Sequence, residues 1–392
     1  MTVTLPEARG TEARRAPSRP MRAAVLGAGW VSREVWIPLL SAHPRFEVAA
    51  VVDEDPAALR SAAQNVPACE FVRDYRDVDP RGLDVAIVAL PNHMHLPAAQ
   101  RLLEHGVPVF VEKPVCRTLW EAQCLALAGT PRDRTSPVLV HAWSAARHRA
   151  DVRALAAVLP GLGRIRTVRL SWIRAGGVPT SKGWFTDRRL AGGGALLDLG
   201  WHLLDVGLNL LGWPPPARAA GTLYTDWIGG AEAASDWRGH GAEADTGPGP
   251  QREAEADTAV EDTARGFLVT RDGVGVWLET SWASHQPEDV TTIVVEGTEG
   301  QATLRCTFGF SPHRVPASSL TVLRRGRAER IPIPADPVGA EYRRQVDELA
   351  RRLSGQDAAA PGELGPVSMA EVFVLASYVE QFYRSAEKWS TS

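Results

Sequence analysis

The stretch MRAAVLGAGWVS, residues 21–32, joins a short apolar run to a glycine-rich turn and the start of a helical pattern. Gly27 permits a tight turn, and Gly29 lets the backbone approach a pyrophosphate that rests on the amides of the following helix. Ser32 stands at the third position of the motif, where Gly or Ala is usual, and it is small enough for close helix–strand packing. The stretch therefore predicts the opening strand, turn and helix of a dinucleotide-binding domain.

Patterns of buried strands and helices continue to alternate after this turn. The apolar runs cover residues 46–52, 83–90, 108–112 and 136–143, and helical patterns cover 56–66, 96–106 and 119–129. Strands that alternate with helices form a parallel sheet, wound right-handedly, with helices on both faces. We expect an α/β fold that begins with a doubly wound parallel sheet of the Rossmann type over residues 21–142.

The pattern changes in the second part of the chain. Alternating apolar and polar residues, typical of strands with one solvated face, cover 164–172, 218–227, 262–272, 274–282, 290–297 and 302–308. Two helical patterns follow at 339–355 and 367–386. We expect residues 143–392 to form an α+β domain with a large, mostly antiparallel open sheet.

Two segments and a group of side chains stand apart from these elements. Residues 229–259 are rich in Gly, Ala and acids with two prolines, which predicts a mobile insertion between strands. Residues 1–20 are rich in Arg and Pro without an apolar signal segment, which predicts a disordered tail and leaves Met21 as an alternative start. Several tryptophans end or lie in predicted strands, and we interpret them as packing or interface residues: Trp172, Trp227, Trp277 and Trp282.

Composition narrows the class of protein. The net charge is -3, so no basic field favours nucleic acid or anionic lipid as a partner. The sequence contains no run of about 18 apolar residues, so we predict no membrane span. The 4 cysteines are scattered without zinc or redox spacing, and we expect free thiols in a reducing cytoplasm.

The acid after the second predicted strand indicates the cofactor. Asp53 follows the apolar run 46–52, where a carboxylate binds the ribose 2′-hydroxyl of NAD and repels the 2′-phosphate of NADP. Glu54 and Asp55 follow, and no Arg or Lys stands beside them to hold a phosphate. We therefore expect NAD rather than NADP, with a plain turn residue as the alternative for Asp53.

The third predicted strand also ends beside the expected cofactor, because ligands of such sheets bind outside the carboxyl ends of the strands. His93 and His95 have a spacing that could hold a metal, but no third ligand stands nearby, so we predict no metal site. His95 is the better of the two for a cofactor contact. We assign the remaining positions around this edge to cofactor binding as well: Trp30, Val31, Leu90, Pro91, Asn92 and Glu112.

The stretch 195–211 predicts a helix that is apolar apart from a single polar stripe. Asp198, His202, Asp205 and Asn209 are three or four residues apart, so they share one face. A helix that is apolar on its other sides is buried, and a buried polar stripe must either be hydrogen-bonded internally or face a wet cavity. Internal pairing would join Asp198 to His202, and Asp205 to backbone or to an arginine. The alternative is a catalytic role for the Asp198 end, with a structural role for Asp205 and Asn209.

Two motifs make a family resemblance specific. PVFVEKPV at 108–115 and GWFTDRRLAGGGALLDLGWHLLD at 183–205 resemble the signatures of the Gfo/Idh/MocA oxidoreductases, and VEGTEGQATL at 295–304 is similar to a later segment of that family. The resemblance implies a Rossmann domain followed by an open-sheet domain that often forms an oligomer interface. It also implies reversible hydride transfer between a nicotinamide and a hydroxyl-bearing carbon, usually of a sugar or cyclitol. A homo-oligomer, dimer or tetramer, is therefore expected.

The resemblance also assigns roles. By motif position Lys113 matches the family's active-site lysine, and Asp198 and His202 match its catalytic Asp and His. We expect His202 to act as the base, Asp198 to orient it and Lys113 to bind the reacting oxygen, so that all three also touch the substrate. Arg147 and Trp184 are further substrate-binding candidates. The alternatives are a nucleotide-activated or secondary-metabolite sugar used with NADP(H), or an NAD-binding sensor or scaffold without catalysis.

Overall fold

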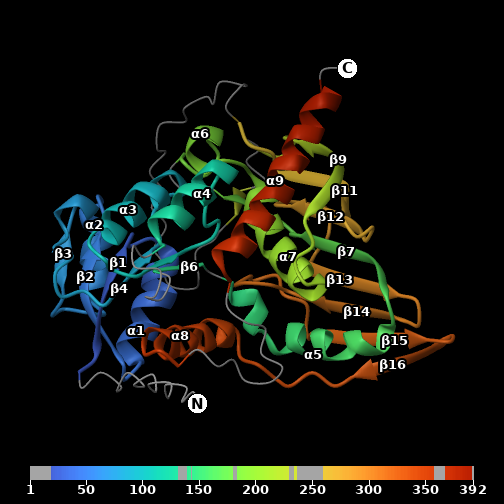
Figure 1. Cartoon of the computed structure of the whole chain (residues 1–392), viewed down its shortest axis with the longest axis horizontal. Helices are drawn as coiled ribbons and strands as arrows, with labels where there is room; N and C mark the ends of the chain where they lie inside the picture. The colour runs from blue at the N-terminus through green and yellow to red at the C-terminus, as the bar shows by residue number, and fades with distance from the viewer. Residues whose placement is uncertain are drawn as a thin grey trace, which may run out of the picture.

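Two β-sheets lie side by side in the structure, a computed structural model (Figure 1). It describes residues 19–130, 139–142, 144–179, 183–228, 234–235, 259–356 and 367–390. One sheet has 6 strands and is parallel, and the other has 8 strands and is mostly antiparallel. The fold class predicted from the sequence is confirmed.

The first sheet has the strand order β3-β2-β1-β4-β5-β6, which is typical of dinucleotide-binding domains. Its strands are β1 (Met21–Leu26), β2 (Phe46–Val52), β3 (Glu70–Val72), β4 (Val85–Val88), β5 (Val109–Val111) and β6 (Val140–Ala142). The helices around it are η1 (Ser32–Trp36), α1 (Ile37–Ala42), α2 (Pro56–Ala63), α3 (Asn92–Glu104) and α4 (Leu119–Ala128), with the short η2 (Tyr75–Asp77). The chain order reverses between β1 and β4, and this is where such sheets bind their ligand.

The glycine-rich turn fits this switch point closely. Gly27 has φ +97°, and a Cβ atom there would lie 2.3 Å from the carbonyl oxygen of Ala89 at the end of β4. Only glycine lets the β1 turn pack this tightly against its neighbour. At Gly29, by contrast, a Cβ would meet nothing within 4 Å. The turn is therefore closed toward the sheet and open on the side where a pyrophosphate would lie.

The second sheet has the order β16-β15-β14-β13-β7-β12-β11-β9. Its strands are β7 (Ile165–Ile173), β9 (Pro216–Tyr224), β11 (Thr263–Thr270), β12 (Gly275–Ser281), β13 (Val290–Gly297), β14 (Gln301–Cys306), β15 (Ser319–Arg324) and β16 (Arg327–Ile331). Neighbours are antiparallel except β7 and β12, which pair in parallel. The sequence analysis did not predict β3, β15 or β16.

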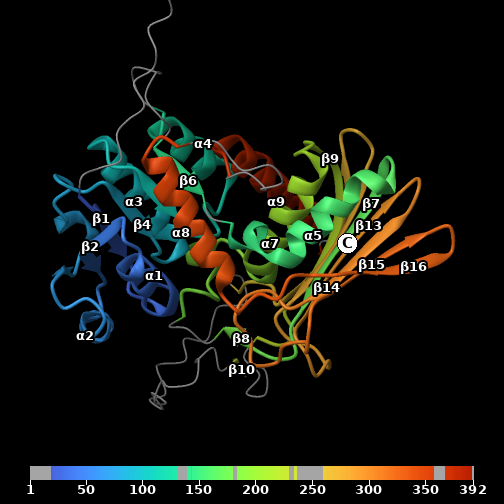
Figure 2. The same ribbon diagram turned by 90° about the horizontal axis from the view of Figure 1, so that it is seen from below.

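One face of the second sheet is covered by helices α5 (Ala150–Val158), α7 (Ala195–Leu211) and α9 (Met369–Ser390), which lie between this sheet and the first domain (Figure 2). The shorter elements η3 (Ala145–His148), η4 (Leu159–Leu162), β8 (Val178–Pro179), α6 (Arg188–Ala191) and β10 (Ala234–Ser235) connect them. The opposite face carries exposed apolar side chains, including Trp277, Leu323 and Tyr224.

Helix α8 (Ala340–Leu353) follows the second sheet in the chain but returns to the first domain. Figures 1 and 2 both show it beside α1. Val346 and Leu349 of α8 are buried in the same apolar cluster as Trp36 and Phe110. A second cluster runs from β4 and β5 through α7 into the eight-stranded sheet. The two domains are therefore held together by apolar clusters that contain residues of both, as well as by the covalent connection of the polypeptide.

Most of the predicted tail and of the predicted insertion at 229–259 lies outside the described residues. A hydrogen bond connects the residues on either side of that insertion: the Trp227 backbone N–H donates to Asp262 Oδ2 at 2.6 Å. All 4 cysteines are described, and each is a free thiol. Across the described ranges no helix has both the length and the apolar character that a bilayer crossing requires.

Candidate active site

Lys113, Asp198 and Trp282 form a hydrogen-bonded group where the two domains meet. Lys113 follows β5 at the carboxyl edge of the parallel sheet, and its Nζ donates to Asp198 Oδ1 at 2.5 Å. Asp198 comes from the first turns of α7, and its other oxygen, Oδ2, accepts a hydrogen bond of 2.9 Å from the indole Nε1 of Trp282. Both carboxylate oxygens are thus bound, one by each domain.

The start of α7 is fixed by a buried carboxylate. Glu261 accepts hydrogen bonds from the backbone N–H of Gly194 at 3.0 Å and of Leu196 at 2.9 Å, and from the Tyr383 hydroxyl at 2.9 Å. A Cβ on Gly194 would lie 1.8 Å from the Glu261 carbonyl oxygen, so glycine is required there. A negative charge at a helix N-terminus is favourable. Gly194 therefore allows the start of α7, and with it Asp198, to pack closely against the backbone at Glu261.

His202 lies one turn further along α7, on the same side as Asp198. Its ring packs against Trp172 with centroids 5.7 Å apart, and it is partly exposed. Within the described residues no hydrogen bond joins His202 to Asp198, whose two carboxylate oxygens accept from Lys113 and Trp282. The imidazole nitrogens are therefore open to an incoming hydroxyl group. The predicted shared face is present, but the Asp198 carboxylate is bound to Lys113.

The charges at this site favour distinct protonation states. Burial by itself raises the pKa of Asp198, but the positive charge of Lys113 and the bonds from Lys113 and Trp282 outweigh it and hold that pKa below its usual range. Burial, and then the charge of Lys113, lower the pKa of His202 to about 3, against the opposing effect of Asp198. At neutral pH the site thus holds an ionised Asp198 and a neutral His202, which can accept a proton.

The residues around the β1 turn fit a dinucleotide. The Ser32 hydroxyl is buried and has no hydrogen-bond partner in the described part of the chain, so it can donate to a phosphate at the helix start. Asp53 accepts the backbone N–H of Ala28 at 2.8 Å and that of Asp55 at 2.9 Å. A carboxylate has about four acceptor sites, so Asp53 keeps capacity for ribose hydroxyls. NAD bound here would bring a hydride acceptor to the edge that carries Lys113.

Several predicted cofactor residues instead make contacts within the protein. Asn92 donates to the Ala191 carbonyl at 2.8 Å, and the buried Glu112 accepts the Trp36 indole N–H at 3.1 Å. The ring nitrogens of His95 lie 3.0 Å and 2.8 Å from the carbonyl oxygens of Pro114 and Leu90. Burial lowers the pKa of His95 to about 4. These contacts favour structural roles for the buried Asn92, His95 and Glu112.

The other predicted cofactor positions are partly exposed along the same edge: Trp30, Val31, Leu90 and Pro91. Trp30 also touches the second domain, since its ring lies 5.2 Å from that of Phe310 in an edge-on arrangement. These four positions remain predicted cofactor contacts. The two domains thus meet at the mouth of the dinucleotide site.

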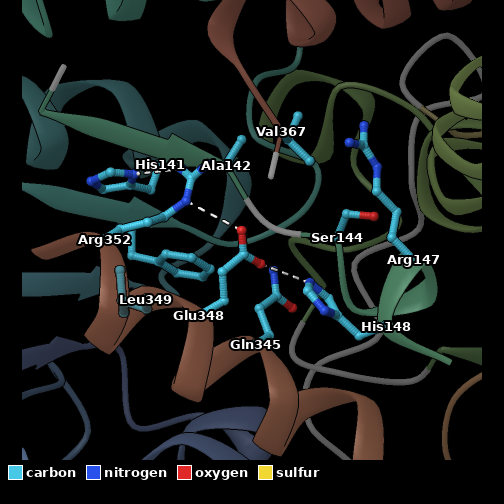
Figure 3. Close-up of a pocket in the computed structure, with 11 residues that line it drawn as sticks. His141, Ala142, Ser144, Arg147, His148, Gln345, Glu348, Leu349, Arg352 and Val367 are labelled. Carbon is cyan, nitrogen blue, oxygen red and sulfur yellow. Dashed lines mark hydrogen bonds and ion pairs between the residues drawn. The ribbon is translucent and has the colours of Figure 1, made fainter. Parts of the chain in front are cut away.

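Arg147 lies in a different place from the one its predicted substrate role requires. Its side chain is 1% exposed, and its Nη2 donates to Asp205 Oδ1 at 2.7 Å. It borders a small pocket of about 10 Å³ at the junction of the domains, which has room for about one water molecule (Figure 3). His148 and Arg352 both pair with Glu348 beside this pocket. The geometry favours a structural ion pair of Arg147 with Asp205, the structural role predicted for that aspartate.

Trp184 and Phe185 lead from the loop before α6 toward the site. The Trp184 and Phe185 rings lie 4.9 Å apart, and Phe185 lies 5.8 Å from Trp282. Trp184 is partly exposed and remains a predicted substrate contact. Trp282 and Glu261 are the two residues of this site whose roles the sequence analysis missed. In the sequence each is simply an aromatic or acidic residue beside a predicted strand. Many residues without a role in a site fit that description.

Comparison with known proteins places the chain in a family. Residues 21–135 match the oxidoreductase family with an NAD-binding Rossmann fold, and residues 160–303 match the GFO/IDH/MocA C-terminal domain. Over 369 residues the chain is 47% identical to a protein of Amycolatopsis mediterranei (strain S699) named "Putative UDP-kanosamine synthase oxidoreductase subunit", with 93% of this chain and 96% of that relative covered.

Solved structures share the whole fold. GenD2 from gentamicin A biosynthesis, in complex with NAD, has a TM-score of 0.70 at 22% identity, with 98% of this chain and 97% of that chain covered. KijD10, a 3-ketoreductase from Actinomadura kijaniata in complex with NADP and TDP-benzene, has a TM-score of 0.70 at 20% identity, with 93% and 98% covered. The resemblance found in the motifs is confirmed, and the chain belongs to the Gfo/Idh/MocA family of oxidoreductases.

Proposed function

We propose that this NAD(P)-dependent sugar oxidoreductase transfers a hydride between NAD(H) and a secondary hydroxyl or ketone of a sugar, with Lys113, Asp198 and His202 moving the proton. The observation that carries the proposal is the 2.5 Å ion pair of Lys113 with Asp198 next to the His202 imidazole, which makes no hydrogen bond within the described residues. These groups stand at the sheet edge that also holds the glycine-rich turn. An ammonium and a neutral base side by side supply the two contacts that an alcohol needs when it loses hydride and proton.

In the oxidation direction His202 accepts the hydroxyl proton, because it is neutral at the pH where the enzyme works. NAD, when bound, takes the hydride from the same carbon. The Lys113 ammonium donates a hydrogen bond to the reacting oxygen and stabilises the negative charge that develops on it. In reduction, the Lys113 ammonium returns a proton to that oxygen, because His202 is neutral at this pH. The pairing of Asp198 with Lys113 holds the lysine side chain in place, so we assign Asp198 to the lysine as well as to the electrostatics of His202.

We propose a nucleotide-activated hexose as the substrate, with other sugars, amino sugars and cyclitols as the alternatives. The Amycolatopsis relative bears a name that refers to a UDP-linked amino sugar and to a subunit of a synthase. An amino sugar carries nitrogen where a hexose carries oxygen, and oxidation of that hydroxyl to a ketone prepares the carbon for an amine. The word subunit in that name also supports a second protein as a partner, which would add the amine to the ketone that this chain forms.

For the cofactor we propose NAD rather than NADP, on the basis of the Asp53 carboxylate at the end of β2. We also propose a homo-oligomer that pairs through the open face of the eight-stranded sheet. Trp277, Leu323 and Tyr224 are 44%, 42% and 42% exposed there, which is unusual for side chains of this size. Sedimentation of the wild type and of Trp277→Glu tests this, with a shift toward monomer as the expected result.

The test of the function is a substrate panel. The purified chain is incubated with NAD and with UDP-hexoses, free hexoses, amino sugars and cyclitols, and formation of reduced nicotinamide is followed by absorbance. Repeating the panel with NADP tests the role of Asp53. We expect turnover of a UDP-hexose with NAD. If Lys113→Ala and His202→Ala both keep near-wild-type turnover, the proposed roles are wrong.

A further inference from the structure

Trp282 has contacts that packing alone does not explain. It directly follows β12, and its side chain is 0% exposed. Its indole N–H points at Asp198 Oδ2, at 2.9 Å, while its backbone N–H donates to the Asp262 carbonyl at 2.9 Å. The ring of Phe185 packs against it at 5.8 Å. The indole is thus fixed by backbone, by a neighbouring ring and by the carboxylate.

The bond from Trp282 decides which way the Asp198 carboxylate is turned. A carboxylate with one bound oxygen can rotate about its last side-chain bond, whereas one with both oxygens bound by donors from different elements is held in a single orientation. Lys113 holds Oδ1 from the first domain, and Trp282 holds Oδ2 from the second. His202, one helical turn away, is the other group that a rotated carboxylate could meet.

We propose that Trp282 is a positioning residue, whose N–H keeps Asp198 turned toward Lys113 and away from His202. The lysine side chain then stays aimed at the reacting oxygen, and the imidazole stays free to take the substrate proton. This inference rests on the proposed function for its effect on turnover, but its effect on the carboxylate can be measured without turnover.

Two substitutions separate the hydrogen bond from the packing. Trp282→Phe keeps an apolar aromatic ring and removes the N–H. Trp282→His loses the outer ring of the indole but keeps a five-membered ring in which Nε2 occupies the place of the tryptophan Nε1, since both are the second atom from Cγ. Trp213→Phe is the matched control, because Trp213 lies just beyond the other end of α7 and its indole N–H has no hydrogen-bond partner in the described chain.

We expect the two Trp282 variants to rank in opposite order for thermal stability and for kcat. Trp282→Phe keeps more thermal stability but loses about ten- to a hundredfold in kcat, with KM little changed, because a hydrogen bond to a buried charge is lost. Trp282→His is less stable but closer to the wild type in kcat. The acid limb of the kcat profile moves to higher pH in Trp282→Phe, because Asp198 loses a donor that stabilises its ionised form. Trp213→Phe leaves the pH profile of kcat unchanged.

Crystal structures of the two Trp282 variants give the readout that does not depend on turnover. In Trp282→Phe we expect the Asp198 carboxylate to rotate away from its position on Lys113, and in Trp282→His to keep it. An unchanged carboxylate in both variants overturns the inference, and so does a kcat order that simply follows thermal stability. Absence of turnover in the wild-type panel, with the carboxylate rotating as expected, instead contradicts the proposed function and leaves the positioning role standing.

Discussion

Lys113 and Asp198 come from different domains, and the ammonium of one lies 2.5 Å from the carboxylate of the other. The pair therefore forms only when the parallel sheet and helix α7 are docked. The two side chains of the pair are 24% and 10% exposed, so the charges are partly shielded from water. The proposed catalytic arrangement is thus a product of the domain interface rather than of either domain alone.

Replacing Lys113 tests the centre of this arrangement. Lys113→Met keeps most of the aliphatic stem and removes the charge, so we expect kcat/KM to fall by about 10²- to 10⁴-fold. The pKa of Asp198 rises in this variant, because its neutralising partner is gone. Steady-state kinetics measure the loss, and NAD affinity measured by fluorescence titration serves as the control. A loss of less than about threefold would place the chemistry elsewhere.

His202 makes acid pH unfavourable for the folded state. Its pKa lies at about 3 in the fold against 6.5 for the ordinary imidazole. Between these values the unfolded chain binds a proton that the folded chain does not, so stability falls as pH drops through this window. We expect His202→Gln to lose less stability than the wild type when the pH is lowered from about 7.5 to 5. Urea denaturation at both values measures the difference, and equal losses in the two proteins would contradict the assigned shift.

The proposed role of Asp53 in the choice between the two nicotinamide cofactors can be tested by substitution. Asp53→Ala removes the carboxylate proposed to bind the ribose, and we expect the ratio of NAD to NADP affinity to fall by about tenfold or more. Glu54→Ala is the matched control, since it removes the same charge from the exposed neighbouring position. Isothermal titration with each cofactor gives the ratio. The prediction fails if both variants change the ratio equally.

Arg147 is expected to matter for folding rather than for substrate. Arg147→Met leaves Asp205 as a buried charge without its partner, which costs about 3–5 kcal/mol of unfolding free energy. The double variant Arg147→Met/Asp205→Leu removes both charges and should recover most of that loss. Denaturant unfolding gives the free energies. A rise in KM of the folded Arg147→Met protein without loss of stability would restore the substrate role predicted from the sequence.

Local patterns were sufficient for most of the fold. The run from Met21 to Ser32 predicted its strand, turn and helix because glycine spacing and apolar length act over a few residues. Helix α7 was predicted with Asp198 and His202 on one side, since helical periodicity fixes which residues share a face. The strand β16 was missed because its short sequence, RAERI, is mostly polar and exposed. The strand β15, SLTVLR, does alternate over four residues, but that signal is short and was passed over.

The contacts within the site could not be predicted, because they join residues that lie far apart in the sequence and local patterns report only near neighbours. Asp198 is bound by residues 85 and 84 positions away, Lys113 and Trp282. Arg147 was placed at the substrate because it follows a predicted strand of the parallel sheet, yet the turn after β6 directs it inward to Asp205. Helix α8 follows the second sheet but packs on the first domain. Which partner a polar side chain finds is decided by docking of elements, and only the structure supplies it.

The hydrogen bond between Trp227 and Asp262 brings together the two ends of the stretch that separates them. The chain leaves and returns at this bond, with β10 in between paired to β8, and Glu261, beside the bond, seats α7. Inserted domains are tolerated best where the chain ends of the host lie close together. The stretch between these anchors is therefore the natural place to graft a fluorescent reporter or a binding module, and a reporter there would sit next to the helix that carries Asp198, the proposed catalytic carboxylate.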